Sequence, residues 1–93
     1  MDKQALARWH GLCAQFKGPF RYAEVYVSKL TRSATLTLRT PGTEGGTLSG
    51  IGADNADYRQ IGHEIIDVAR EHGLLDHMSE TSVVDNDKEH HQK

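Results

Sequence analysis

The chain has a single cysteine and no long apolar run. Because Cys13 has no second cysteine to pair with, an internal disulfide is excluded. No segment approaches the ~18 consecutive apolar residues that a membrane-spanning helix needs. The start, Met1-Asp2-Lys3-Gln4, is polar and unlike a secretory signal. Together these absences predict a soluble protein of a reducing, cytoplasmic compartment.

Neither sign of charge dominates. The formal net charge is −2, so the total charge predicts no particular partner. The distribution is uneven, because residues 1–39 hold seven Lys or Arg against two acids, whereas the remainder holds four against eleven. Such asymmetry is typical of an interaction surface, or of basic strands and acidic helices that neutralise each other within a fold.

The length of 93 residues fits one domain. Residues 1–75 contain nearly all the apolar positions and predict a single compact domain. In residues 76–93 the apolar content falls to Met78, Val83 and Val84. Burial of so few groups does not offset the entropy of ordering this stretch. We therefore expect residues 76–93 to form a polar, disordered tail.

Two segments show the three-to-four-residue apolar spacing of amphipathic helices. The first covers residues 3–17 and ends at the Gly-Pro pair at 18–19, where proline cannot continue the helix. Gly11 lies inside it, which suggests that another element packs closely there. The second helix begins near residues 54–55 and ends at a glycine C-cap, Gly73.

Three strands are predicted between the helices, at residues 20–30, 34–39 and 47–52. Their alternation separates an apolar face from a second face, and the apolar set is Ala23, Val25, Val27, Ala34, Leu36 and Leu38. The second face carries Tyr22, Glu24, Tyr26, Thr35, Thr37 and Arg39. In the alternative, a register shift turns Tyr22 and Tyr26 toward the core, or the tail covers them. Hairpin connections make sequential strands neighbours. The predicted fold class is thus α+β: helix, three-stranded antiparallel β-meander, helix (α-β-β-β-α), with both helices packed on one sheet face.

This order of elements resembles that of the double-stranded RNA-binding domain. The RNA contacts of that family include a histidine in the loop between the first two strands and a lysine-rich start to the final helix. Here the loop is Thr31-Arg32-Ser33, and the final helix begins with the acidic segment 54–57. The resemblance covers the order of elements alone, so no binding residue is carried over.

Few residue patterns in the sequence indicate a catalytic or metal-binding site. His63 and Asp67 lie four residues apart on the second helix, where they share a face and would be the first pair to consider in an enzyme. A structural metal site needs about four ligands, and no second close His or Cys pair accompanies them. Cys13 lies on an apolar stripe, which indicates a buried hydrophobic side chain rather than a nucleophile. We predict neither a metal site nor a cofactor.

The leading hypothesis is a small non-catalytic interaction module. It would be an adaptor, inhibitor or accessory protein of the kind that phages and plasmids encode, and would bind a protein partner or a second copy of itself through the open sheet face. Tyrosine and arginine are typical contacts at such interfaces. The predicted contacts are Tyr22, Tyr26, Thr37 and Arg39.

Two alternatives stay open. The basic N-terminal half could bind nucleic acid, in which case the affinity must fall with salt as counterions are released. The phosphate contacts would then be Arg21, Lys29 and Arg32, together with Arg39. The third possibility is a small enzyme using His63 and Asp67.

Overall fold

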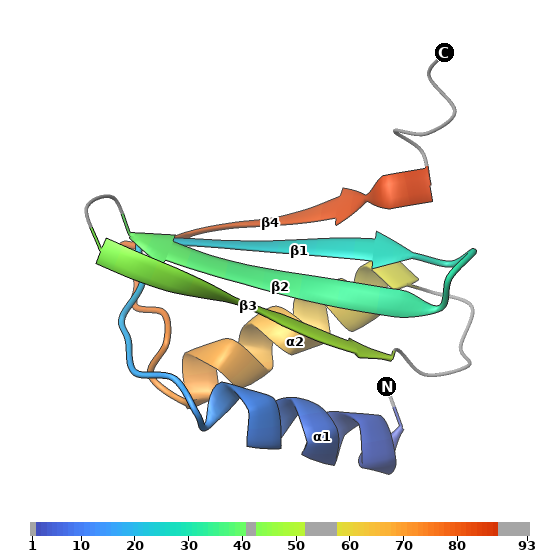
Figure 1. Cartoon of the computed structure of the whole chain (residues 1–93), viewed down its shortest axis with the longest axis horizontal. Helices are drawn as coiled ribbons and strands as arrows, with labels where there is room; N and C mark the ends of the chain where they lie inside the picture. Colours follow the sequence, from blue (N-terminus) through green and yellow to red (C-terminus); the bar gives the residue numbers. More distant parts are fainter. Residues whose placement is uncertain (1, 41–42, 52–57, 88–93) are drawn as a thin grey trace.

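The computed structural model describes residues 2–40, 43–51 and 58–87, and these contain two helices and four strands. The elements follow in the order α1 (Lys3–Cys13), β1 (Tyr22–Ser28), β2 (Ser33–Thr40), β3 (Thr43–Ile51), α2 (Tyr58–Glu71) and β4 (Glu80–Asp85), as Figure 1 shows. This content confirms the predicted α+β class. Among the described residues, neither helix is long and apolar enough to cross a membrane.

The sheet is mixed, with the strand order β3-β2-β1-β4. Strands β1, β2 and β3 pair antiparallel in chain order, as predicted from their hairpin connections. Strand β4 instead pairs in parallel with the free edge of β1, with Val83 opposite Val25. The prediction of a sheet made only of an antiparallel meander is therefore wrong.

The predicted disordered tail is wrong for Glu80–Asp85, which is strand β4. Its order comes from pairing with β1, an element more than 50 residues away, rather than from its own composition. The turn before it fixes the register, because the Ser79 hydroxyl donates to the carbonyl of Phe20 at 2.6 Å and the Glu80 amide donates to the carbonyl of Arg21 at 2.9 Å. The last residues of the predicted tail, 88–93, lie outside the described residues.

Helix α1 begins at a capped turn and ends earlier than predicted. The Asp2 carboxylate accepts a hydrogen bond from the Ala5 amide at 2.8 Å, as an N-cap side chain does. Beyond Cys13, the amide of Phe16 donates to the Cys13 carbonyl three residues back at 3.2 Å. Such bonds tighten the chain into a turn, so the helix stops before the Gly-Pro pair at 18–19.

Helix α2 ends as its sequence predicts. Gly73 adopts a φ of 75°, a left-handed conformation that glycine takes without steric cost. The amide of Leu74 donates to the Ala69 carbonyl at 3.0 Å, and that of Gly73 donates to the Arg70 carbonyl at 3.0 Å, which together form a Schellman cap. The predicted N-cap at 54–55 lies outside the described residues.

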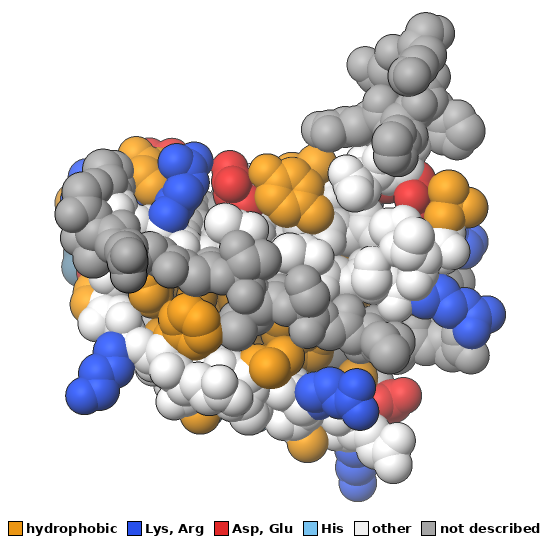
Figure 2. Space-filling view, viewed as in Figure 1, with side chains coloured by type: hydrophobic (Ala, Val, Ile, Leu, Met, Phe, Trp, Pro, Cys, Tyr) orange, Lys and Arg blue, Asp and Glu red, His pale blue; other side chains and the backbone are white. Residues whose placement is uncertain are grey.

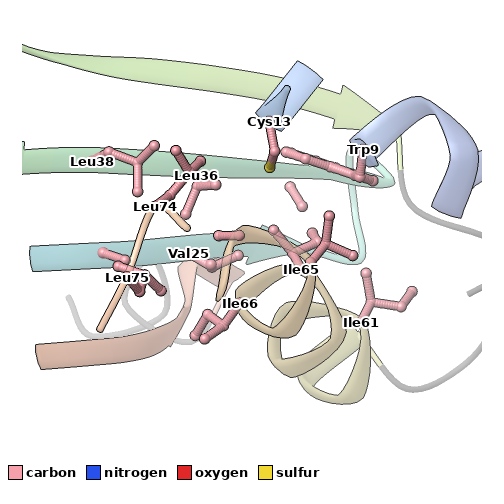
Figure 3. Packing of buried hydrophobic residues seen from close by; sticks show 14 of the residues in the cluster. Trp9, Cys13, Val25, Leu36, Leu38, Ile61, Ile65, Ile66, Leu74 and Leu75 are labelled. Atoms are coloured by element: carbon pink, nitrogen blue, oxygen red, sulfur yellow. The ribbon is translucent and has the colours of Figure 1, made fainter. Parts of the chain in front are cut away.

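The core lies between the helices and one face of the sheet. The predicted apolar face is confirmed, because register pairs such as Val25 and Leu36 are fully buried. Figure 3 shows side chains of both helices, among them Trp9 and Ile65, directed into the same layer. Helix α2 contacts β1 and β4, whereas α1 contacts α2 and β3. In Figure 1 both helices lie below the sheet, which leaves its upper side free of any described helix.

Candidate interaction surface

The side chains of β1 and β2 that point away from the core form a continuous polar and aromatic surface. The register places Tyr22 beside Arg39 and Glu24 beside Thr37. Strand β4 extends this surface, because Glu80 is the register partner of Tyr22 on the other side. We call this surface the outer face, and it consists of Tyr22, Glu24, Tyr26, Thr35, Thr37, Arg39, Glu80, Ser82 and Val84.

Arg39 joins two neighbours on the outer face. Its guanidinium carbon lies 4.9 Å from the centre of the Tyr22 ring, a cation–π distance. Its Nη2 atom lies 3.7 Å from Glu24 Oε2. The Arg39 side chain is 56% exposed, so water screens this ion pair and it contributes little to stability. Its effect is to orient the guanidinium between a ring and a carboxylate.

Glu24 is the centre of the arrangement. The Tyr26 hydroxyl donates to Glu24 Oε1 over 3.4 Å, a long hydrogen bond, while Oε2 faces Arg39. One carboxylate thus lies between Arg39 and Tyr26, both predicted contacts, and Arg39 in turn faces Tyr22. Glu24 was not predicted as a contact, although its position between Tyr22 and Tyr26 in the strand alternation was the available signal. Thr37, its register partner, completes the predicted set.

A shallow hollow opens between β1 and β4 on this side of the sheet. It has a volume of about 90 Å³ and is lined by Tyr22, Glu24, Glu80, Thr81 and Ser82. Two of these residues carry carboxylates and three carry hydroxyls. The lining is therefore suited to a group that donates hydrogen bonds or carries positive charge, and it would repel a phosphate.

The basic residues predicted to contact nucleic acid lie at opposite ends of the sheet. Arg21 precedes β1, whereas Lys29 and Arg32 belong to the loop between β1 and β2. The seven residues of β1 separate the two groups by about 20 Å. In Figure 2 the Lys and Arg side chains are likewise scattered along the outline, with other side chains between them.

The remaining candidates for chemistry are dispersed or inaccessible. Asp67 forms an exposed ion pair with Arg70 at 3.6 Å, and His63 is exposed on the same helix. Cys13 has no exposed surface, and burial raises the pKa of its thiol to about 11. Such a thiol stays protonated at neutral pH and is a poor nucleophile. Over residues 2–40, 43–51 and 58–87, no three His, Cys, Asp or Glu side chains gather closely enough to hold a metal ion.

Comparisons of the chain with models of protein families, with curated proteins and with solved structures found no match.

Proposed function

We propose that the chain is a non-catalytic interaction module that binds a protein partner through the outer face. The observation that carries the proposal is the row Tyr22, Arg39, Glu24 and Tyr26, in which ring, guanidinium and carboxylate contact one another on a sheet face that no described helix covers.

The contacts within this row leave its tyrosine and arginine side chains partly ordered before a partner binds, which favours binding. Tyr22 and Tyr26 are already half-buried along their strand, so an incoming surface would cost them little additional conformational entropy. Tyrosine and arginine are also the residue types that contribute most binding energy at protein interfaces. The row therefore supplies two rigid aromatic anchors with one oriented cation between them.

Charge favours a protein partner over nucleic acid. Glu24 and Glu80 place two carboxylates on the outer face, and Arg39 is engaged with the first of them. Phosphate would meet that negative charge, whereas a Lys or Arg side chain of a protein would be attracted by it. The partner we propose is thus a flat protein surface that places a basic side chain over the hollow between β1 and β4.

The test compares capture by three forms of the full chain used as bait in an extract of its native host. The double variant Tyr22→Ser/Tyr26→Ser removes both rings. The matched control is Leu30→Ser/Met78→Ser, which also removes two apolar groups, 77% and 63% exposed, from places outside the outer face. We expect the control and the wild type to retain the same protein and the tyrosine variant to lose it. Calorimetry with the purified partner should repeat that difference.

Equal retention by the tyrosine variant, with its circular dichroism unchanged, would refute the proposal. The alternative of nucleic-acid binding has its own signature in fluorescence anisotropy with labelled DNA or RNA. Binding that weakens steeply with salt and is lost in Arg32→Ala/Arg39→Ala would show that the partner is nucleic acid rather than a protein.

A further inference from the structure

A pair of histidines joins the two helices on the other side of the sheet. His10 Nδ1 lies 2.9 Å from His72 Nε2, although 62 residues separate the two positions in the chain. The ring centres are 5.1 Å apart and the ring planes are inclined by 55°. Both side chains are half-buried. His10 belongs to α1, and His72 follows the last residue of α2.

This spacing matches the separation of two ligands on one metal ion. Imidazole nitrogens bind Zn²⁺ at about 2.0–2.1 Å. Two such nitrogens are therefore about 2.9 Å apart when they subtend a right angle at the metal, and about 3.3 Å apart at the tetrahedral angle. In a hydrogen bond the two nitrogens of His10 and His72 point at each other, so each ring would have to turn by about 35–45° for both lone pairs to meet at one metal ion.

Metal binding by both facing nitrogens requires one ring to change its tautomer. In the hydrogen bond, one ring donates an N–H and the other accepts with a lone pair. For both facing nitrogens to bind a metal, the donor ring must take the other neutral tautomer, with its proton on the far nitrogen. No net proton is released if both rings are neutral, and a ring charged beforehand would have to lose its proton first.

The surroundings favour a cation. Beside His10 lies a cavity of about 240 Å³ between the helices. Two apolar residues, Leu6 and Val68, and three carboxylate residues of α2, Glu64, Asp67 and Glu71, complete its lining, which does not include His72. It has room for water, and its carboxylates would attract a cation, although Arg70 offsets the charge of Asp67. Because the described residues contain no group of three protein ligands, water would occupy the metal positions that the two imidazoles leave open.

We propose that His10 and His72 form a site for one divalent transition-metal ion of the class that prefers imidazole, namely Zn²⁺, Ni²⁺ or Cu²⁺. The ion would tie α1 to the C-terminal end of α2. This site shares no residue with the outer face and does not depend on the function proposed for it.

The test is thermal unfolding of the full chain with and without Zn²⁺, in a His90→Ala/His91→Ala background, which removes the one pair of histidines that are consecutive in the sequence. An ion that bridges two helices binds the folded chain more tightly than the unfolded chain, so it raises the melting temperature. We expect an increase of roughly 5–10 °C at ten times the dissociation constant. Adding His10→Gln or His72→Gln to this background should abolish the increase in melting temperature and weaken Zn²⁺ binding by about tenfold or more. The control variant, His63→Gln/His77→Gln, replaces two exposed histidines instead and should leave the increase in melting temperature unchanged.

A second measurement avoids any change at the site itself. In the background chain, nitrogen chemical shifts of the histidine rings should change on Zn²⁺ addition for two rings, His10 and His72, and calorimetry should give one ion per chain. If Zn²⁺ at millimolar concentration shifts neither ring, or if the melting increase survives His10→Gln, the pair is a structural hydrogen bond alone and the proposal is wrong.

Discussion

Gly62 of α2 lies directly against Val83 of β4. A methyl group at Gly62 would stand 2.6 Å from Val83 Cγ1 and 3.2 Å from its Cγ2, and also 3.4 Å from Val27 Cγ1. The helix therefore approaches the parallel strand pair β1 and β4 as closely as it does because position 62 has no side chain.

We predict that Gly62→Ala destabilises the protein by up to about 2 kcal/mol. Alanine gains about 1 kcal/mol in helix propensity over glycine, but overpacking a buried contact costs about 1–3 kcal/mol. The measurement is urea unfolding. Adding Val83→Ala to Gly62→Ala should recover part of the loss, whereas Val83→Ala alone should destabilise. Strictly additive effects would show that the two side chains do not compete for the same space.

Gly11→Ala should have the opposite effect. The prediction that another element packs closely at Gly11 is wrong, because the residue is exposed and a methyl group there would meet no atom within 4 Å. The propensity gain of about 1 kcal/mol is then unopposed, which corresponds to an increase of roughly 4–8 °C in melting temperature. Calorimetry checks this, and a decrease would mean that Gly11 has a contact the structure lacks.

The Asp87 side chain forms hydrogen bonds with the end of β1 and the start of the loop that leads to β2. Its carboxylate accepts hydrogen bonds from the hydroxyl of the buried Ser28 at 2.7 Å and from the amide of Lys29 at 2.9 Å. We expect Asp87→Ala to destabilise by about 1–3 kcal/mol, because the Ser28 hydroxyl loses its acceptor. Hydrogen exchange should locate the effect, with the Lys29 amide exchanging faster. An unchanged exchange rate at Lys29 would contradict the contact.

Cys13 makes stability sensitive to alkaline pH. Burial raises the pKa of this thiol from 9.0 to about 11, so between these values the unfolded chain loses a proton that the folded chain keeps. The contribution of Cys13 to the free energy of unfolding is fully present below pH 9. It is lost as the pH rises toward 11, by about 2–3 kcal/mol at most. Urea unfolding at several pH values should show a steeper alkaline loss in the wild type than in Cys13→Ala. Parallel curves would contradict it.

The elements that the sequence predicts correctly are those whose pattern is local. The alternation at Val25 and Leu36 identifies the buried face because a strand turns its side chains to opposite sides at every step. Gly73 identifies the end of α2 because its left-handed conformation closes the cap within the same few residues. On the outer face, the same alternation brings Tyr22, Tyr26 and Arg39 to one side.

Features that depend on distant partners were not predictable. The stretch around Val83 is too polar to predict a strand, and it becomes one because the free edge of β1 supplies the hydrogen bonds. The contact of His10 with His72 depends on how α1 and α2 pack together, which no spacing in the sequence encodes. In both cases the determining neighbour is more than 50 residues away.

Because strand β4 is the last described element to be synthesised, the sheet can be completed only late in translation. The residues of β4, 80–85, leave the ribosome after every other described element has been made. Until then β1 has a partner on one side only, and its second edge offers unpaired backbone groups to any neighbouring nascent chain. Translation that stalls before Glu80 would prolong this exposure, so premature termination in this region should yield aggregates rather than a shorter folded protein.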